Sequence, residues 1–412
     1  MEMIEDVVIV GAGIAGLGTA VGLKRVGIRS LILETAPQLR TAGAALTLFP
    51  NAWCALHTLA VSHKLTPFYL PLRGSSVTNV ATGTVSNVPL DNGGKETRPR
   101  GVHRKALLEA LAEELPADSI RFSSKLSAIE IQEHGGASLA VLSLKDGTTI
   151  KSKVLIGCDG VHSVVAKWLG LSTPIHSGRS GIRGLSYFPQ GHHLKEEAQQ
   201  FVDVGKRAGL IPLNDNEIYW FLTHSQGEGE EMTREPEVIQ KAVISNYAKD
   251  FPSEFITAVN QTDLPTLTSA PLMLRQPWKV MFGELSKGNV TVCGDAMHPM
   301  TPDLGQGGCS SLEDGVVLSR HIGLSFIKNG GRLVAEEMGE ALHGYVQERR
   351  WRVAALIAGS YMSGWVQQGG SSWWRKFVRD VIFYPFLARR FFTATDYDCG
   401  TLPSVSLSNK ID

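Results

Sequence analysis

The stretch that decides the fold is "VVIVGAGIAGLGTAVGL", residues 7–23. Its four apolar residues at 7–10 predict a strand buried on both faces, as in a parallel sheet. Gly11, Gly13 and Gly16 follow with the spacing G-x-G-x-x-G, where a helix begins. The first glycine permits a tight turn, the second lets backbone N–H groups approach a pyrophosphate, and the third lets the helix pack against the strand. The stretch therefore predicts a dinucleotide-binding β-α-β unit.

The second half of this unit indicates which dinucleotide binds. A second strand, "RSLILE" at residues 29–34, ends in Glu34, 18 residues beyond Gly16. A carboxylate at this place accepts hydrogen bonds from an unphosphorylated ribose, so FAD or NAD is favoured over NADP. We find no second G-x-G-x-x-G after a strand. A nicotinamide used together with FAD would therefore bind only transiently.

Composition limits the classes of protein to consider. The 412 residues are 43% hydrophobic and 19% charged, as in an ordinary globular protein, and their net charge of zero gives no reason to expect a nucleic-acid partner. Five scattered cysteines without a C-x-x-C pair favour a reducing compartment and no metal site. The first strand begins near residue 6 and no apolar run reaches 18 residues, so we expect a cytoplasmic protein without a signal or transit peptide or a membrane span.

Beyond the opening unit, the pattern alternates between strands and helices. Strand-like segments with a D-G turn fill residues 120–157, and alternating segments with a helix near 236–250 fill residues 175–285. A buried strand at 290–293 leads through a loop to a helical pattern at 310–326, and residues from about 335 onward favour helices. This order predicts a large α/β protein.

Three motifs together resemble a known family. They are "GAGIAG" with Glu34, "CDGVHS" at 158–163 and "GDAMHPMTPDLGQGG" at 294–308. In order and spacing they are similar to the signatures of single-component (class A) FAD-dependent monooxygenases of the para-hydroxybenzoate hydroxylase-like class, which includes salicylate hydroxylases and zeaxanthin epoxidase. The resemblance runs through about residue 350, and "DYDCGTLP" near the end is similar to plant members.

The resemblance implies a fold and a division into domains. The fold is α/β: a Rossmann-like FAD-binding domain with an inserted β-sheet domain that binds substrate, followed by C-terminal helices. The FAD-binding domain comprises residues 1–75, 100–175 and 285–335. The substrate domain comprises residues 76–99 and 176–284, and the C-terminal helical region comprises residues 336–412.

The resemblance also implies an activity. The protein is expected to be an enzyme that binds FAD, oxidises NADPH or NADH, and inserts one oxygen atom from O2 into a small organic substrate through a flavin C4a-hydroperoxide. The reaction is hydroxylation of an aromatic or phenolic compound, or epoxidation of an alkene. Three alternatives stay open: an FAD-dependent reductase or oxidase without oxygen insertion, a non-catalytic FAD-binding protein, and an NAD-only dehydrogenase.

The chemistry of the third motif can be derived from its residues. Asp295 follows a strand, where its carboxylate can accept hydrogen bonds from a polyol such as the ribityl chain of FAD. Pro302 stiffens the next loop, and its glycines expose backbone N–H groups at a helix N-terminus, which would stabilise negative charge on a reduced flavin. We therefore predict that Pro302, Gly305 and Gln306 form a flavin-adjacent catalytic loop. His298 lies within a flavin-binding motif, so we do not assign it as a base.

The second motif departs from the family pattern. The usual D-G-x-x-S-x-x-R has Ala166 in place of its arginine, with Lys167 beside it, which weakens the expected nicotinamide contact. By resemblance, Arg104 at a helix start contacts FAD, and Arg40 after the second strand is a further candidate from its position, although both are also compatible with solvated surface positions. The predicted cofactor-binding residues are Gly11, Gly13, Ile14, Ala15, Gly16, Glu34, Thr35, Arg40, Arg104, Asp159, Gly160, Gly294, Asp295, Pro302, Gly305, Gly307 and Gly308.

The substrate side is less well determined. Arg183, Tyr219, Trp220 and Phe221 are candidates for the pocket, but strand alternation sends only some of them inward and each aromatic is equally compatible with a sheet core. The stretch 371–392 mixes aromatic and basic residues and is compatible with a peripheral membrane contact or with a helix packed on the body. The sequence does not determine the oligomeric state.

Overall fold

The computed structural model describes residues 4–40, 44–89, 98–134, 137–225, 235–368 and 394–404. The opening stretch forms β1 (Ile4–Val10) and α1 (Ile14–Arg25), as predicted. β1 pairs in parallel with β2 (Ser30–Leu33) on one side and β10 (Thr149–Gly157) on the other. Residues 7–9 of β1 are completely buried, because parallel strands of this kind are covered on both faces.

The first sheet is built around these strands. Its order is β16-β17-β10-β1-β2-β7, with β9 and β8 attached beside β10. The added strands are β16 (Ser286–Lys287), β17 (Val290–Val292), β7 (Ile120–Arg121), β8 (Leu126–His134) and β9 (Ala137–Leu144). β17 is parallel to β10, so the third motif leaves the sheet at the same edge as the glycine loop.

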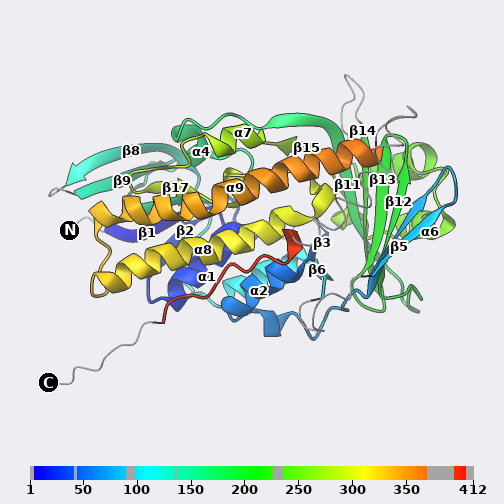
Figure 1. Cartoon of the computed structure of the whole chain (residues 1–412), viewed down its shortest axis with the longest axis horizontal. Helices are drawn as coiled ribbons and strands as arrows, with labels where there is room; N and C mark the ends of the chain where they lie inside the picture. The colour runs from blue at the N-terminus through cyan, green and yellow to red at the C-terminus, as the bar shows by residue number, and fades with distance from the viewer. Residues whose placement is uncertain are drawn as a thin grey trace.

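A second sheet lies at the other end of the molecule (Figure 1). Among the described residues its order is β15-β11-β14-β13-β12-β4-β5. The strands are β15 (Thr268–Leu274), β11 (Ile175–Tyr187), β14 (Glu217–Ser225), β13 (Lys206–Pro212), β12 (Glu197–Asp203), β4 (Gly74–Asn79) and β5 (Val85–Pro89). Only the β12–β4 pair is parallel within this sheet as described. One face packs on α6 (Ser253–Asn260) and α5 (Pro236–Ala242), forming a separate apolar core.

Two long helices connect the parts. α8 (Gln306–Lys328) packs on α1 so closely that a Cβ on Gly315 would lie 2.9 Å from the Thr19 nitrogen. α9 (Ala335–Gln368) runs beside α8 from the first sheet to the second (Figure 1). Short elements complete the frame: β3 (Ala45–Leu48), β6 (Arg100–His103), α2 (Pro50–Thr58), α3 (Arg104–Ala112), α4 (Val164–Trp168) and α7 (Pro277–Met281).

The α/β prediction is confirmed, with differences in two segments of the chain. The helix expected near 236–250 is α5 followed by a π-turn at Val243–Tyr247. Residues 396–404 form no helix; Gly400 adopts a positive φ of 77° and Pro403 follows it, so a helix cannot continue there. The stretch 371–392 lies outside the described residues, and the division into domains stays a prediction.

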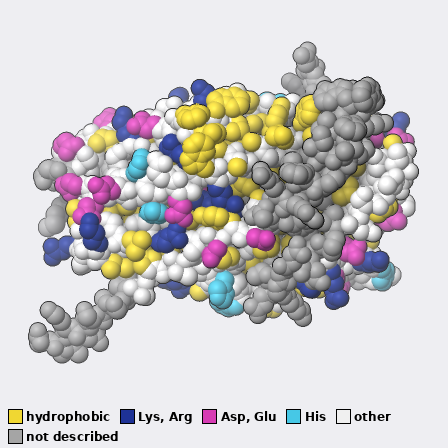
Figure 2. Space-filling model, viewed as in Figure 1, with side chains coloured by type: hydrophobic (Ala, Val, Ile, Leu, Met, Phe, Trp, Pro, Cys, Tyr) yellow, Lys and Arg dark blue, Asp and Glu magenta, His cyan; other side chains and the backbone are white. Residues whose placement is uncertain are grey.

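The surface carries charges of both signs and a local apolar patch. Trp278, Phe282 and Trp351 are more than half exposed, and Figure 2 shows hydrophobic side chains gathered over α7 and the neighbouring part of α9. Phe282 and Trp351 pack edge to face with their ring centroids 6.5 Å apart. Within the described residues, every helix is too short or too polar to cross a lipid bilayer.

Candidate active site and cofactor cleft

The glycine loop has the geometry that its spacing predicts. Gly11 has a φ of 105°, and a Cβ there would lie 2.5 Å from the Cys158 carbonyl oxygen. A Cβ on Gly16 would lie 1.9 Å from the Gly11 carbonyl oxygen, so the turn and α1 can approach only without side chains. A Cβ on Gly13 would meet nothing within 4 Å. The open side of the loop is therefore at Gly13, where a phosphate needs space.

Glu34 ties the loop to the second strand. It is buried, and its two carboxylate oxygens accept hydrogen bonds from the backbone N–H groups of Ala12 at 2.9 Å and Ala36 at 2.8 Å. Each oxygen retains a lone pair that can accept a ribose hydroxyl. The exposed Arg40 forms an ion pair with Glu34, with its Nε 3.3 Å from the carboxylate, and Thr35 is exposed beside it.

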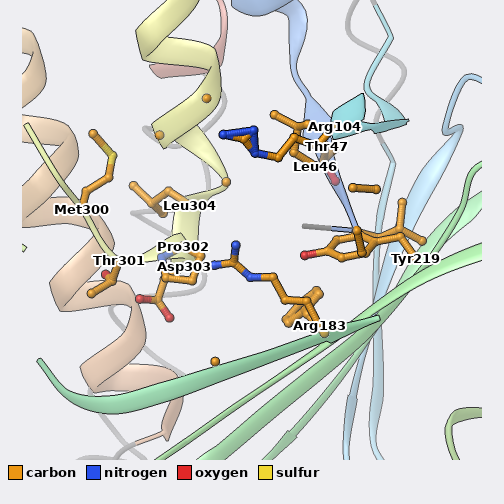
Figure 3. Close-up of a pocket in the computed structure, with 18 of the residues that line it drawn as sticks. Leu46, Thr47, Arg104, Arg183, Tyr219, Met300, Thr301, Pro302, Asp303 and Leu304 are labelled. Carbon is orange, nitrogen blue, oxygen red and sulfur yellow. The ribbon is translucent and has the colours of Figure 1, made fainter. Parts of the chain in front are cut away.

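A cavity of about 750 Å³ lies between the glycine loop, the loop after β17 and the inner face of the second sheet (Figure 3). It brings together residues from all three motifs and from the second sheet. The predicted site residues that line it are Gly13, Ile14, Ala15, Arg104, Gly160, Arg183, Tyr219, Phe221, Asp295, Pro302, Gly305, Gly307 and Gly308. Gly11, Gly16, Glu34, Thr35, Arg40, Asp159, Gly294, Trp220 and Gln306 are not among its lining residues.

Arg104 and Asp295 place opposite charges on the cavity wall. Burial lowers the pKa of the Arg104 guanidinium, although the charge of Asp295 partly opposes this effect. The Arg104 Nη1 atom is buried and has no hydrogen-bond partner among the described residues. Burial raises the pKa of Asp295, whose side chain is accessible from the cavity, against the lowering effect of His298 and Arg104. A buried guanidinium nitrogen without a partner is costly, so this site is suited to an anionic ligand.

The second motif is divided between structural and cavity positions. Asp159 accepts hydrogen bonds from the backbone N–H groups of Val164 at 2.6 Å and Val165 at 3.4 Å, so it fixes the start of α4. Burial raises the pKa of Asp159. Gly160 lines the cavity with a φ of 81° and open space where its Cβ would be. Ala166, at the position of the family's arginine, is buried in α4 and adds no charge to the cavity.

The third motif brings a helix N-terminus to the cavity. Pro302–Leu304 form a single turn, and Gly305 follows with a φ of 64°; its Cβ would lie 2.8 Å from the Phe49 ring. α8 begins at the next residue, and Gly307 and Gly308 line the cavity. Because neither glycine carries a side chain, the first N–H groups of α8 are accessible to a ligand.

Two of the predicted site residues, Gln306 and Trp220, have side chains that point away from the cavity, so these two predictions are wrong. Gln306 is completely buried, and its Oε1 accepts a hydrogen bond from Asn51 at 2.9 Å, behind the cavity wall. Trp220 is also completely buried, and its Nε1 donates to Thr262 at 2.9 Å on the face covered by α6. Alternation along β14 explains the position of Trp220, because Tyr219 and Phe221 face the cavity while Trp220 points away.

A buried charged network behind the cavity was not predicted. Asp314 accepts from His298 Nε2 at 2.5 Å, from the Gly294 N–H at 2.9 Å and from Arg349 Nε at 2.6 Å. Burial alone would raise the pKa of Asp314, but the charges of His298 and Arg349 hold it below its ordinary value. Glu313 lies 2.7 Å from Arg349, so the carboxylates of α8 are neutralised by α9. This network fixes Gly294 and hence the path of the third motif.

A second buried cluster joins the third motif to the second sheet. Asp303 accepts two hydrogen bonds from Arg179, at 2.8 and 2.7 Å. Arg207 donates to the Asp303 carbonyl oxygen at 3.0 Å. Bidentate arginine–carboxylate pairs have a fixed geometry, so this cluster holds the Pro302–Leu304 turn against the sheet.

Comparisons with known proteins agree with this site. A family model described as an FAD binding domain matches residues 5–360. The chain is 42% identical over 405 residues to a protein of Arabidopsis thaliana named Monooxygenase 2, which covers 96% of this chain and 98% of that protein. The chain belongs to the family of FAD-dependent monooxygenases. It is also 30% identical over 322 residues to an FAD-dependent urate hydroxylase of Mycolicibacterium vanbaalenii, covering 76% of this chain and 78% of that protein.

Solved structures confirm the fold of this monooxygenase. The structure of Klebsiella pneumoniae HpxO complexed with FAD and uric acid superposes with a TM-score of 0.81 at 24% identity, covering 96% of this chain and 98% of that chain. The predicted resemblance and the para-hydroxybenzoate hydroxylase-type fold are thereby confirmed. The protein is an enzyme that uses FAD, and NAD(P)H and O2 are the co-substrates typical of its class.

The residues of the cavity suit FAD. Gly13 leaves open space beside the N-terminus of α1, Arg104 lines the same cavity, and Asp295 offers a carboxylate to a polyol. The N-terminus of α8 supplies partial positive charge next to the Pro302 turn. Among the described residues none of these groups has a strong partner, and each matches one part of the cofactor.

Proposed function

We propose that this monooxygenase hydroxylates a small planar aromatic compound that carries an anionic oxygen, and that Arg183 holds this oxygen. FAD would be held by the glycine loop at its pyrophosphate, by Asp295 at its ribityl chain, and by the Pro302–Gly308 loop at its ring system. Arg104 and Glu34 would contact its phosphate and ribose groups. When bound, FAD supplies the redox chemistry that activates O2.

The observation that carries this proposal is the environment of Arg183. Its side chain extends from β11 into the cavity, on the side opposite Arg104 (Figure 3). Among the described residues it has no hydrogen-bond or ion-pair partner, whereas the nearby Arg179 and Arg207 are both engaged with Asp303. An accessible guanidinium in a largely apolar cavity is suited to a carboxylate, phenolate or enolate.

Tyr219 complements this anchor. Burial raises the pKa of its phenol, and the charge of Arg183 opposes that effect only in part. Tyr219 therefore stays protonated near neutral pH, and its hydroxyl can donate a hydrogen bond to a ligand in the cavity. Apolar side chains around it, including Leu46, Phe49 and Phe221, exclude water and favour a flat ring between Tyr219 and the flavin-binding wall.

The test is turnover with a panel of phenols, aromatic acids, enolic heterocycles and non-polar alkenes, using NADPH and NADH under ¹⁸O2. We expect one labelled oxygen in an anionic aromatic product. Arg183→Gln should lower kcat/KM by about 10- to 150-fold, since a hydrogen bond to a charged group contributes about 1.5–3 kcal/mol. FAD content should be unchanged. NAD(P)H oxidation without label in any product would instead identify an oxidase or reductase, and preference for alkenes would favour epoxidation.

We also propose a cytoplasmic location and a peripheral contact with membranes. All five cysteines are free thiols, as expected in a reducing compartment. Trp278, Phe282 and Trp351 form the exposed patch described above, and indole rings favour membrane–water interfaces. The fraction of the protein that sediments with anionic vesicles should therefore fall when Trp278 and Phe282 are replaced by serine.

A further inference from the structure

The last described segment, residues 394–404, forms a strap along α2 and α8 (Figure 1). Arg352 donates to the Ala394 carbonyl oxygen at 2.8 Å, and Arg320 donates to that of Cys399 at 2.9 Å. Thr58, at the end of α2, donates to the Gly400 carbonyl oxygen at 3.2 Å. The strap is thus held by side chains of α2, α8 and α9.

Tyr397 connects the strap to the buried network behind the cavity. Its ring lies under the guanidinium groups of Arg352, 4.0 Å from the ring centroid, and Arg349, at 5.2 Å. Both arginines also bind Glu313, which accepts a hydrogen bond from Asn51 of α2. Displacement of the strap would therefore expose the charges that hold α8 in place.

A pair of cysteines lies where the strap meets α2. The thiols of Cys54 and Cys399 and a carboxylate oxygen of Asp398 all lie within 4.8 Å of one another. Cys54 Sγ donates to Asp398 Oδ1 at 3.4 Å. Cys54 is partly exposed on α2, whereas Cys399 is completely buried in the strap. The two cysteines are far apart in sequence and adjacent in space.

The two thiols differ in reactivity. A hydrogen bond from Cys399 lowers the pKa of the Cys54 thiol, although burial and Asp398 act in the opposite direction. The same contact, together with burial, raises the pKa of Cys399. Cys54 is therefore the accessible nucleophile, and Cys399 is the protonated neighbour placed to react second.

We propose that Cys54 and Cys399 form a reversible disulfide that fastens the strap to α2 when hydrogen peroxide is present. The Cys54 thiolate attacks one peroxide oxygen, the O–O bond breaks, and after proton transfer a sulfenic acid and one water are formed. The Cys399 sulfur then attacks the Cys54 sulfur and displaces the hydroxyl group as a second water. The two thiols lose two electrons together, and the peroxide is reduced to two waters. This inference does not depend on the substrate proposed above.

The local geometry favours a disulfide over a bound metal ion. Asp398 Oδ1 already accepts the Gly400 N–H at 2.8 Å as well as the Cys54 thiol. A structural zinc site takes four ligands, and the described residues offer three at this place, one of them an exposed carboxylate. Cross-linking would keep Tyr397 under Arg349 and Arg352, so the oxidised protein should hold its α8 network more firmly.

The first test is thiol mapping of the purified protein, with and without FAD. The protein is treated with hydrogen peroxide, denatured, alkylated, digested and analysed by mass spectrometry. We expect one linked peptide pair, Cys54–Cys399, that dithiothreitol reverses, while Cys158, Cys293 and Cys309 stay alkylatable as internal controls. Cys54→Ser and Cys399→Ser should both abolish the link, and Cys54→Ser should also protect Cys399 from oxidation. Peroxide that leaves both thiols alkylatable, or converts Cys54 to a sulfinic acid without a link, overturns the proposal.

A second measurement separates this role from a merely structural pair. Asp398→Asn removes a charge that raises the Cys54 pKa, so it should speed link formation by about two- to tenfold near pH 7. Oxidation should raise the Tm of the apoprotein by about 2–5 °C in wild type and not in Cys54→Ser. Stoichiometric zinc binding that blocks alkylation of both thiols would identify a metal site and refute the disulfide.

Discussion

Replacing individual glycines of the opening loop by alanine should separate folding from cofactor binding. Gly13 has a φ of −83° and a ψ of −174°, which any residue can adopt, and a Cβ there would meet nothing within 4 Å. Gly13→Ala should therefore leave the stability of the apoprotein unchanged or raise it by about 0.4–1 kcal/mol through the unfolded state. Gly16→Ala places its Cβ 1.9 Å from the Gly11 carbonyl oxygen, so it should destabilise the protein by about 3 kcal/mol, the upper end for overpacking.

For FAD binding we expect the opposite order: Gly13→Ala, the milder substitution for stability, should weaken binding more than Gly16→Ala. A methyl group on Gly13 occupies the space through which the N-terminus of α1 reaches a phosphate. Loss of one backbone hydrogen bond to a charged group costs about 1.5–3 kcal/mol, which corresponds to a roughly 10- to 150-fold rise in the Kd for FAD. Gly18→Ala is the matched control in the same helix, because its Cβ would make only an ordinary contact of 3.6 Å with Leu312.

The assay is thermal unfolding of each apoprotein and fluorescence titration with FAD in the same buffer. Gly13→Ala with wild-type Tm and weak FAD binding supports the assignment of the open side of the loop. Gly13→Ala that binds FAD as tightly as wild type would show that the pyrophosphate does not pass over this residue. Gly16→Ala that unfolds at the wild-type temperature would show that the close approach of the turn and helix is not required.

Four further variants test other parts of the site. Arg104→Gln should raise the Kd for FAD by at least about tenfold without lowering the Tm of the apoprotein, as the buried Nη1 atom of Arg104 has no hydrogen-bond partner among the described residues. Asp314→Asn should destabilise the protein by about 3–5 kcal/mol at pH 7, measured by urea unfolding, because it leaves Arg349 under-compensated. The folded-state pKa of Asp314 is lowered, so the wild type keeps this stabilisation above about pH 4 and loses it in stronger acid. The difference in the free energy of unfolding between wild type and Asp314→Asn should therefore become smaller in acid. Tyr219→Phe should raise KM for an anionic substrate, whereas Trp220→Phe should lower the Tm and leave KM unchanged in the same assays.

The part of the fold nearest the cofactor could be predicted because it depends on local rules. A buried strand, three glycines and an acid at fixed spacing are sufficient to specify β1, α1 and β2, and the structure shows why Gly11 and Gly16 are needed. The third motif could be predicted in the same way, since its glycines and Pro302 determine the backbone itself. The orientation of one side chain could not be predicted: Gln306 turns away from the cavity although its backbone begins α8.

Side-chain orientation in the second sheet could not be predicted from β14 alone. The segment of Tyr219, Trp220 and Phe221 is aromatic without interruption, so hydrophobicity does not distinguish the two faces. Orientation is decided by α6, whose Phe255 packs edge to face against Trp220 at 5.8 Å. That helix is distant in sequence, and a shift of one residue in register would reverse every side chain.

The buried charged network behind the cavity could not be predicted without knowing how two helices, α8 and α9, pack against each other. Glu313 and Asp314 in α8 would ordinarily predict a solvent-exposed face, because paired acids are rarely buried. They are completely buried because Arg349 of α9 lies against both, and this pairing depends on how α8 and α9 pack. The N-terminal half of α8 is therefore fixed by buried charges from α9 as well as by its apolar contacts with the core. A change at Arg349 of α9 or at Tyr397 of the strap should accordingly alter cofactor binding, although neither residue lines the cavity.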